Sequence, residues 1–266
     1  MTASLLTPAA PLNPDLAPVD RPPGRGSIGR RQGALIAGVG YVLLFGLAVF
    51  ANFFVREGLV VSGDATATAA NIVESEGLFR LGLLSFLVIF LLDVVVAWAL
   101  YIVFRSANRD VSLVAAWFRI VYTVFLGIGA IYFFQALQLL GGSSFLGAFD
   151  AEQLNAQALV ALETFNSTWL IGLAAFGIHL VFLGVLVLQS GYAPRALGFV
   201  LIAAGVAYVV DTAAHSMLAN YEDVETLLLV FVAVPSVLAE GWFGLWLLLR
   251  GGKGRSSEPA ALPQAG

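Results

Sequence analysis

Long apolar segments alternate with short polar stretches along most of the chain. Six of these segments reach the ~20 residues that an α-helix needs to cross a hydrocarbon core of ~30 Å. The pattern therefore predicts six transmembrane helices, and the third, as the longest, should tilt or project from the bilayer. We place these helices at residues 33–55, 79–104, 111–139, 165–188, 195–215 and 227–249.

The polar stretches between the spans contain turn and capping signals. Residues 141–144 (GGSS) and 191–194 (GYAP) are typical of tight turns. Within residues 62–77, Asp64 is a suitable N-cap for a short helix that should stop at Gly77. The chain between the first and second spans is therefore predicted to hold a surface helix.

Residues 148–166 carry a second amphipathic pattern before the fourth span. Apolar side chains recur there at helical spacing, at Leu154, Ala158, Leu159 and Leu162. We expect this segment to form a helix that lies along the membrane interface before the chain turns into the fourth span.

The two ends of the chain lack such patterns. Residues 1–29 contain six prolines and no helical period, which favours a flexible leader. A secretory signal peptide is not expected, because the prolines interrupt the only short apolar piece. Residues 252–266 have the composition of a disordered tail. The prediction is a single all-α domain, residues 30–251, between two flexible ends.

Composition agrees with a membrane protein. Of the 266 residues, 59% are hydrophobic and 11% are charged, whereas soluble domains are roughly half apolar and a quarter charged. The chain has no cysteine, which excludes disulfides, thiolate nucleophiles and iron–sulfur clusters. The few basic residues form no stripe of the kind that binds nucleic acid, so we expect the lipid bilayer as the main partner. No cofactor is predicted.

Charge is distributed unevenly between the two sets of span ends. The termini and alternate span ends collect most basic residues, whereas the opposite connections are acidic and hold only Arg56 and Arg80 as cations. The positive-inside rule then predicts cytoplasmic N and C termini and insertion in the inner (plasma) membrane. The basic residues on the predicted cytoplasmic side are Arg21, Arg25, Arg30, Arg31, Arg105, Arg109, Arg195, Arg250, Lys253 and Arg255.

Ionisable residues also occur in the middle of four spans. At a rise of 1.5 Å per residue, they lie ~14 to 18 Å from the nearest cytoplasmic span end, which places them in one layer. Each costs at least ~2.5 kcal/mol at the bilayer centre, so their side chains should point inward and meet. They are Asp93, Arg119, His179 and Glu240.

Pairing within this layer is left open by the sequence. Arg119 can bind either Asp93 or Glu240, because a guanidinium accommodates planar carboxylate partners on more than one edge. His179 can join the cluster in either protonation state. The cluster is a candidate site for a small molecule, an ion or a proton relay, or a static lock between helices.

Nearby hydroxyl groups extend the candidate site. Tyr122 and Thr123 follow Arg119 by three and four residues and share its helical face. Ser236 stands one turn before Glu240 and directly after Pro235, which removes a backbone donor from the sixth span.

Asp211 and His215 form a separate polar pair near the predicted outer surface. Their i, i+4 spacing suits a metal ligand pair or a proton-transfer pair. No motif supplies a third protein ligand, so we predict no metal site and favour an Asp–His contact at the end of a helix.

Several stretches resemble one bacterial membrane family, catalogued as domain of unknown function 4386. The resemblance covers residues 30–251 in order, and it implies a polytopic membrane protein without a known reaction. It also implies that the recurrent Asp, Arg, His and Glu of the family correspond to Asp93, Arg119, His179 and Glu240. The stretches that carry it are FFVREGLVVSGDATATAANIVESEGLFRLG, FLLDVVVAWALY, AAWFRIVYT, IGLAAFGIHLVFLGVLVLQSGYAPRALGFVLIAAGVAYVVD and AEGWFGLWLLLRG.

Three functional hypotheses follow. The first is a transporter- or sensor-like protein that binds a small molecule, ion or proton at the midplane cluster. The second is a structural or assembly subunit, alone or as a homo-oligomer, whose buried charges fix helix packing. The third is an enzyme acting on a lipid-soluble substrate, with His179 and Glu240 as acid and base. No phosphate loop, catalytic triad order or HExxH motif occurs, so an enzyme is not favoured.

Overall fold

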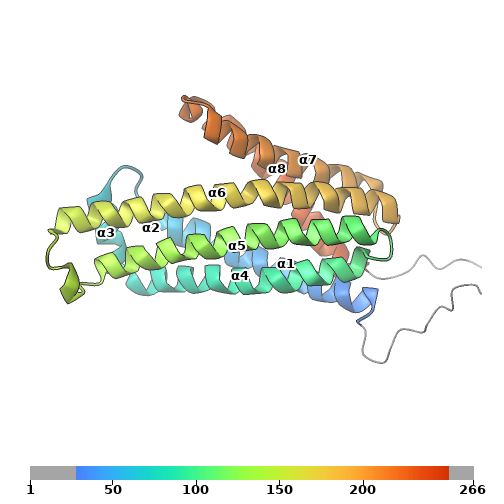
Figure 1. The fold of residues 1–266 in the computed structure, drawn as a ribbon, viewed down its shortest axis with the longest axis horizontal. Coiled ribbons are helices and arrows are strands. Elements are labelled where there is room, and N and C mark those ends of the chain that lie inside the picture. The colour runs from blue at the N-terminus through green and yellow to red at the C-terminus, as the bar shows by residue number, and fades with distance from the viewer. Residues whose placement is uncertain (1–27, 252–266) are drawn as a thin grey trace, which may run out of the picture.

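The computed structural model describes residues 28–251, and within this range the chain is helical without a β-strand (Figure 1). The predicted leader and tail, residues 1–29 and 252–266, therefore lie almost entirely outside the described part. The elements are α1 (Arg30–Val49), η1 (Phe50–Arg56), α2 (Glu57–Leu59), α3 (Ala65–Glu74), α4 (Glu76–Phe104), α5 (Arg109–Leu140), η2 (Ser144–Leu146), α6 (Ala151–Ser190), α7 (Arg195–Met217), η3 (Tyr221–Asp223) and α8 (Glu225–Leu249).

Six helices of the described chain are long and apolar enough to cross a membrane, which confirms the predicted six-span fold. The first of them is continuous over Arg30–Leu59, because α1 passes into a π-helical stretch, η1, and then into α2. The other five are α4, α5, α6, α7 and α8.

The expected interfacial helix before the fourth span is wrong. Residues 151–190 form one straight helix, α6, which makes α6 rather than α5 the longest span. It begins with a capping box between Asp150 and Gln153, and no glycine or proline interrupts it before Gly172. Its apolar stripe, including Ala158 and Leu162, is buried against the neighbouring helices instead of facing lipid.

The surface helix after the first span is confirmed, with an earlier end than expected. Asp64 Oδ1 accepts a hydrogen bond of 2.8 Å from the amide of Ala67, as an N-cap does. Helix α3 ends at Glu74, and Gly77 already lies in α4. Ser75 is the junction, because its non-helical backbone changes the direction of the chain.

The six spans form a closed ring, in which each helix packs on the next one in the sequence. Helix α1 closes the ring by packing on both α4 and α8. Short loops and antiparallel neighbours explain this order, as in other helical bundles. The same order decides below which buried side chains can meet.

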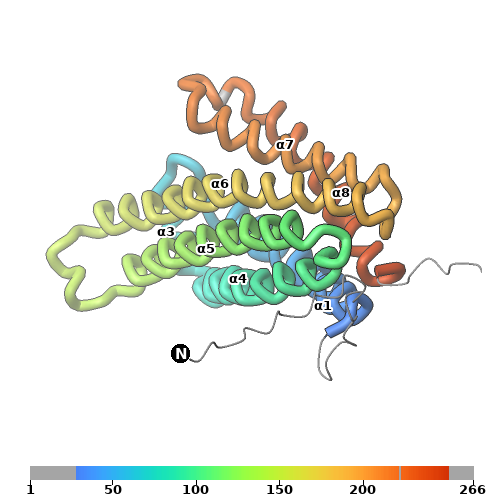
Figure 2. The backbone as a smooth tube through the Cα atoms, turned by 45° about the vertical axis from the view of Figure 1, so that its right-hand side comes forward, coloured from blue at the N-terminus to red at the C-terminus, as the bar shows by residue number. Residues whose placement is uncertain are grey.

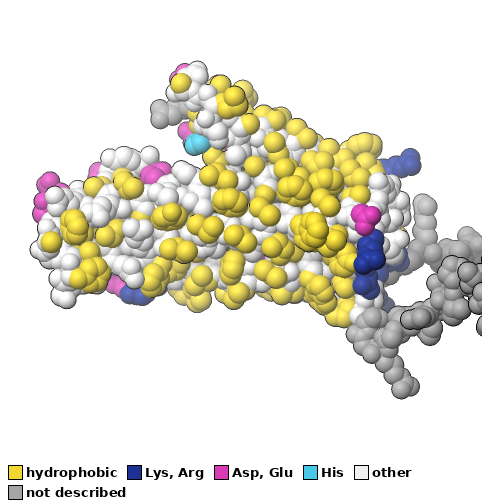
Figure 3. Space-filling model, in the orientation of Figure 1, with side chains coloured by type: hydrophobic (Ala, Val, Ile, Leu, Met, Phe, Trp, Pro, Cys, Tyr) yellow, Lys and Arg dark blue, Asp and Glu magenta, His cyan; other side chains and the backbone are white. Residues whose placement is uncertain are grey.

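Charged side chains separate to the two ends of the ring (Figure 3). We call the end with Arg30, Arg105, Arg195 and Arg250 the basic end, and the opposite end, which carries the 141–150 loop, the acidic end. Apolar side chains cover the surface between them, as expected for a surface that faces lipid.

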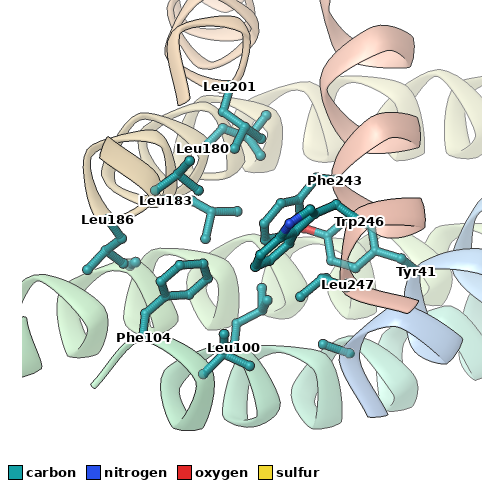
Figure 4. Packing of buried hydrophobic residues seen from close by; sticks show 14 of the residues in the cluster. Tyr41, Leu100, Phe104, Leu180, Leu183, Leu186, Leu201, Phe243, Trp246 and Leu247 are labelled. Carbon is teal, nitrogen blue, oxygen red and sulfur yellow. The ribbon is translucent and has the colours of Figure 1, made fainter. Parts of the chain in front are cut away.

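Two apolar cores lie one above the other along the ring. The core near the basic end takes residues from all six spans and is centred on Phe104, Phe243 and Trp246 (Figure 4). The core near the acidic end takes residues from the first span, α3, α4, α5, η2 and α6, and none from α7 or α8. Helices α7 and α8 therefore share a core with the other spans only near the basic end, and they diverge from α6 toward the acidic end (Figures 1 and 2).

Glycines hold α7 against α6. Gly177 and Gly184 on α6 face Gly205 and Gly198 on α7, seven residues apart on both helices. A Cβ atom on Gly177 would lie 2.5 Å from the carbonyl oxygen of Gly205, and one on Gly184 would lie 2.5 Å from that of Gly198. The two backbones are thus in direct contact, as small residues allow in membrane helices.

Candidate functional site

Three of the predicted midspan residues meet between the two apolar cores. Asp93 on α4, Arg119 on α5 and His179 on α6 are 1%, 2% and 1% exposed. Their helices are consecutive members of the ring, so all three side chains point to its interior at one level. This level is the candidate site.

Arg119 and Asp93 form the central ion pair. Nε of Arg119 donates to Oδ1 of Asp93 at 2.8 Å, and Nη2 donates to the same oxygen. The second carboxylate oxygen, Oδ2, accepts a hydrogen bond of 2.9 Å from the hydroxyl of Thr123. Both oxygens of Asp93 are therefore engaged, and α4 is tied to α5 by charge-assisted hydrogen bonds.

The remaining edge of Arg119 faces α1 and α6. Nη1 donates to the hydroxyl of Tyr41 at 2.9 Å and lies 3.3 Å from Nε2 of His179. The guanidinium carbon also stands 5.0 Å from the ring centre of Tyr41 and 5.3 Å from that of Phe176, within cation–π range. Arg119 thus connects four of the six spans.

The contacts of His179 define its tautomer. Nδ1 lies 2.8 Å from the carbonyl oxygen of Ala115, which can only accept, so Nδ1 carries a proton. Nε2 faces an N–H of Arg119, which can only donate, so Nε2 is the unprotonated acceptor. The surroundings therefore fit a neutral imidazole.

The buried polar side-chain atoms of this group are all hydrogen-bonded. Within residues 28–251, no buried polar side-chain atom of Tyr41, Asp93, Arg119, Thr123 or His179 lacks a partner. One positive and one negative charge cancel, the hydroxyl of Tyr41 and the imidazole bond to the guanidinium, and the hydroxyl of Thr123 bonds to the carboxylate. We call these five residues the Arg119 cluster, and its chemistry is that of a lock between helices.

Glu240 lies apart from the Arg119 cluster. Its Oε1 accepts a hydrogen bond of 3.3 Å from the hydroxyl of Tyr208 on α7. Among the described residues, no Lys, Arg or His nitrogen lies within 4.0 Å of its carboxylate. The sequence left open whether Arg119 pairs with Asp93 or Glu240, and in the structure it pairs with Asp93.

The other predicted hydroxyls have different surroundings. Ser236, one turn before Glu240, is 5% exposed, and its Oγ has no hydrogen-bond partner within the described range. Tyr122 makes no hydrogen bond to the Arg119 cluster within the described range, and its hydroxyl accepts from Nε1 of Trp169 at 3.4 Å. Of the predicted hydroxyls, Thr123 alone therefore bonds to the Arg119 cluster.

Two tyrosines at the site were missed in the sequence, although a signal for one was present. Tyr41 lies eleven residues from Arg30, or ~16 Å along the helix, which is the depth of the four charged residues. Counting hydroxyl-bearing residues at that depth would have found it. Tyr208, the partner of Glu240, lies thirteen residues from Arg195, or ~20 Å, and carries no comparable signal.

A second polar contact joins the first span to α6 in the acidic half of the ring. Nη1 of Arg56 in the π-helical stretch donates to Oδ1 of Asn166 on α6 at 2.6 Å. Near it, Asn52 is 7% exposed, and its Oδ1 has no partner among residues 28–251. π-Helical turns place side chains off the regular α-helical face, which explains why the spacing in the sequence did not predict this contact.

Asp211 and His215 do not bond to each other. Oδ1 of Asp211 accepts from the hydroxyl of Tyr221 at 2.9 Å, and the ring of His215 packs edge-on against Tyr221 at 4.4 Å. Burial and the neighbouring Asp211 raise the pKa of Tyr221 to about 12, so its hydroxyl remains a donor at neutral pH. Within the described range, no group of three His, Asp or Glu side chains is arranged to hold a metal ion.

The fold and the buried charges define a polytopic helical membrane protein. Residues 36–251 match the family described as "Domain of unknown function (DUF4386)", and the chain belongs to this family, as the motifs indicated. The chain is also similar to an uncharacterized protein of Archaeoglobus fulgidus, with 31% identity over 165 residues, which are 62% of this chain and 80% of the relative. No solved structure matches the chain.

Proposed function

We propose that this protein binds a proton or a small monovalent cation at Glu240 and uses its binding and release in a transporter- or sensor-like activity. One observation carries the proposal: the partly buried carboxylate of Glu240 lies in the middle of a span, and among residues 28–251 its only hydrogen-bond partner is a neutral hydroxyl. The neighbouring ion pair, by contrast, is complete without it.

The physical reason is the cost of an isolated charge. An ionised carboxylate away from water is costly unless a cation or several donors compensate it. Tyr208 supplies one donor at 3.3 Å, which is a long hydrogen bond. Glu240 is therefore expected to carry a proton or to hold a cation, and either species can leave.

The position of Glu240 suggests what its occupancy would change. It lies on α8, and its hydrogen-bond partner lies on α7, the two helices that diverge from the rest of the ring toward the acidic end. The Arg119 cluster lies mainly on α4, α5 and α6 and fixes their relative positions. A change of charge at Glu240 would thus act between the Arg119 cluster and the α7–α8 hairpin, which shares no core with the other spans near the acidic end.

The structural and enzymatic hypotheses assign other roles to these residues. The Arg119 cluster fits the structural hypothesis, because each of its buried polar side-chain atoms has a partner within the cluster or on the backbone. The enzymatic hypothesis needs His179 and Glu240 to work on one substrate, but His179 directs both ring nitrogens to Arg119 and Ala115. No observation in the site favours an enzyme over ion or proton binding.

We further propose that both termini are cytoplasmic and that the protein resides in the plasma membrane. The separation of charge (Figure 3) supports this, because the basic end holds the start of α1 and the end of α8 (Figure 1). The positive-inside rule places that end in the cytoplasm.

Infrared spectroscopy of the protein in lipid bilayers tests the proposal at Glu240. The wild type should show the C=O stretch of a protonated carboxylic acid that is missing in Glu240→Gln. Glu225→Gln is the matched control, because Glu225 lies on the same helix in an exposed position and should not contribute this band.

The outcomes distinguish a bound proton from a bound monovalent cation. Loss of the band in Glu240→Gln alone supports proton binding. If the wild type lacks the band, its thermal stability should instead rise with Na⁺ or K⁺, and Glu240→Gln should not respond. An ionised Glu240 that is indifferent to both cations would overturn the proposal.

A further inference from the structure

An open groove of about 970 Å³ lies at the basic end, away from the Arg119 cluster and Glu240. It is formed by the start of α1, the loop between α6 and α7, and the last turns of α8. Its volume is within the range of small-molecule sites. Arg30, Tyr192, Trp242, Leu249 and Arg250 are among its lining residues.

Arg30 and Arg250 bring two positive charges to the groove. Within residues 28–251, no carboxylate oxygen lies within 4.0 Å of Arg30 or Arg250. The guanidinium of Arg30 instead lies 4.2 Å from the ring centre of Tyr192. The groove therefore has an excess of positive charge in the described part of the chain.

Tyr192 and Pro194, in the loop before α7, line the groove together with these cations. The hydroxyl of Tyr192 is 3.1 Å from that of Ser106, and this hydrogen bond and the charge of Arg30 lower the pKa of Tyr192. At the groove's edge, Pro194 precedes α7 and provides no side-chain cap for the first amides of the helix, of which that of Leu197 bonds to the carbonyl of Pro194. The end of such a helix favours anions.

The α8 wall of the groove is apolar and exposed. Trp242, Leu245 and Leu249 are 40%, 55% and 67% exposed. On a transmembrane helix these side chains contact acyl chains, and tryptophan is common at the level of the headgroups. The groove thus joins an anion-binding end to a surface for hydrocarbon.

We propose that this groove binds an anionic phospholipid, with its phosphate between Arg30 and Arg250 and an acyl chain along α8. Basic pockets between transmembrane helices are suited to such headgroups. A soluble phosphate would satisfy the two arginines but would leave the apolar wall without a role, so the lipid is the better match.

Native mass spectrometry of the full-length protein in a neutral detergent tests this inference. The wild type should bind phosphatidylglycerol at least tenfold more tightly than phosphatidylcholine. Arg30→Gln/Arg250→Gln should weaken phosphatidylglycerol binding about 30-fold, since each cation near a membrane surface contributes roughly a factor of five. Its binding of phosphatidylcholine should not change.

Arg105→Gln/Arg109→Gln is the matched control. It removes the same charge from the same end, at exposed positions outside the groove, and should keep the preference for phosphatidylglycerol. Arg30→Lys/Arg250→Lys retains both charges and should retain most of the binding, even where the glutamine variant folds poorly. The same loss in both glutamine variants, or in neither, would overturn the site. Displacement of the lipid by millimolar inorganic phosphate would overturn its assignment to a lipid.

Discussion

Arg119 donates from two nitrogens to a single oxygen of Asp93, which leaves the other carboxylate oxygen for Thr123. This geometry differs from a fork in which each nitrogen has its own oxygen. It lets one carboxylate hold a cation and a hydroxyl of the same helix together. Asp93 is thus the acceptor that fixes α4 against α5.

Substitutions at this pair should show strong coupling. Removing one partner leaves a buried charge unpaired, which costs ~3 to 5 kcal/mol, whereas removing both is less costly. Asp93→Asn and Arg119→Gln should therefore each destabilise the bundle, and the double variant should recover much of the loss. Equilibrium unfolding in mixed detergent measures these free energies.

Arg80 and Glu76 provide the control for this cycle. They also form an ion pair, at 2.7 Å on α4, but both side chains are more than half exposed. Neutralising either should change the unfolding free energy by no more than ~0.5 kcal/mol. Additive losses at Asp93 and Arg119 would contradict a direct energetic link between them.

Two glycine-to-alanine substitutions should show how much the backbone contact between α6 and α7 contributes to stability. Gly177→Ala places a Cβ atom against the carbonyl of Gly205 and should push α7 from α6, at a cost of ~1 to 3 kcal/mol. Gly46→Ala on α1 meets no atom within 4 Å and should be neutral or slightly stabilising. Thermal unfolding in detergent compares the two variants directly.

A variant with a cysteine pair can show whether α7 moves. In Gly177→Ala, a disulfide between cysteines introduced at the facing ends of α6 and α7 should form more slowly than in the parent with the same cysteines. Equal rates of disulfide formation in Gly177→Ala and the parent would show that the close contact is not important for packing. Equal stability of Gly177→Ala and Gly46→Ala would show the same.

His179 should be a neutral imidazole protonated at Nδ1. The carbonyl of Ala115 requires a donor at Nδ1, and Arg119 requires an acceptor at Nε2. ¹⁵N NMR distinguishes the tautomers, and His215→Asn leaves His179 as the single histidine of the chain. A signal from the Nε2–H tautomer or from the imidazolium at neutral pH would contradict the hydrogen-bond arrangement.

The proposed orientation can be tested because the chain lacks cysteine. A cysteine at Ser144 or Asn220, both exposed at the acidic end, should react with an impermeant maleimide on intact cells. A cysteine at Ala107, at the basic end, should react only after the membrane is permeabilised. The reverse pattern would place the termini outside.

The sequence by itself determined the elements and their depths. Long apolar runs have one stable form in lipid, because a helix satisfies its own backbone hydrogen bonds. Helix length then gives each charged residue its depth by simple counting. The six spans, the layer that contains Asp93, Arg119 and His179, and the N-cap at Asp64 all follow from such local rules.

Predictions from the local sequence were wrong where the neighbouring helices decide the position of a segment. Residues 151–163 have the amphipathic pattern of an interfacial helix, but their apolar stripe packs on protein, and the helix continues into the fourth span. The groove between Arg30 and Arg250 was likewise invisible, because these residues are separated by almost the whole described chain and meet only when α1 packs on α8.

The choice of partner for Arg119 shows most clearly what only tertiary structure decided. Asp93 and Glu240 have the same charge and similar depths, so nothing in either span favours one of them. The ring places α5 between α4 and α6 and places α8 between α7 and α1. Hydrogen bonds reach about 3 Å, and the packing of these helices brings Asp93, but not Glu240, within that distance of Arg119, so Glu240 bonds to Tyr208 instead.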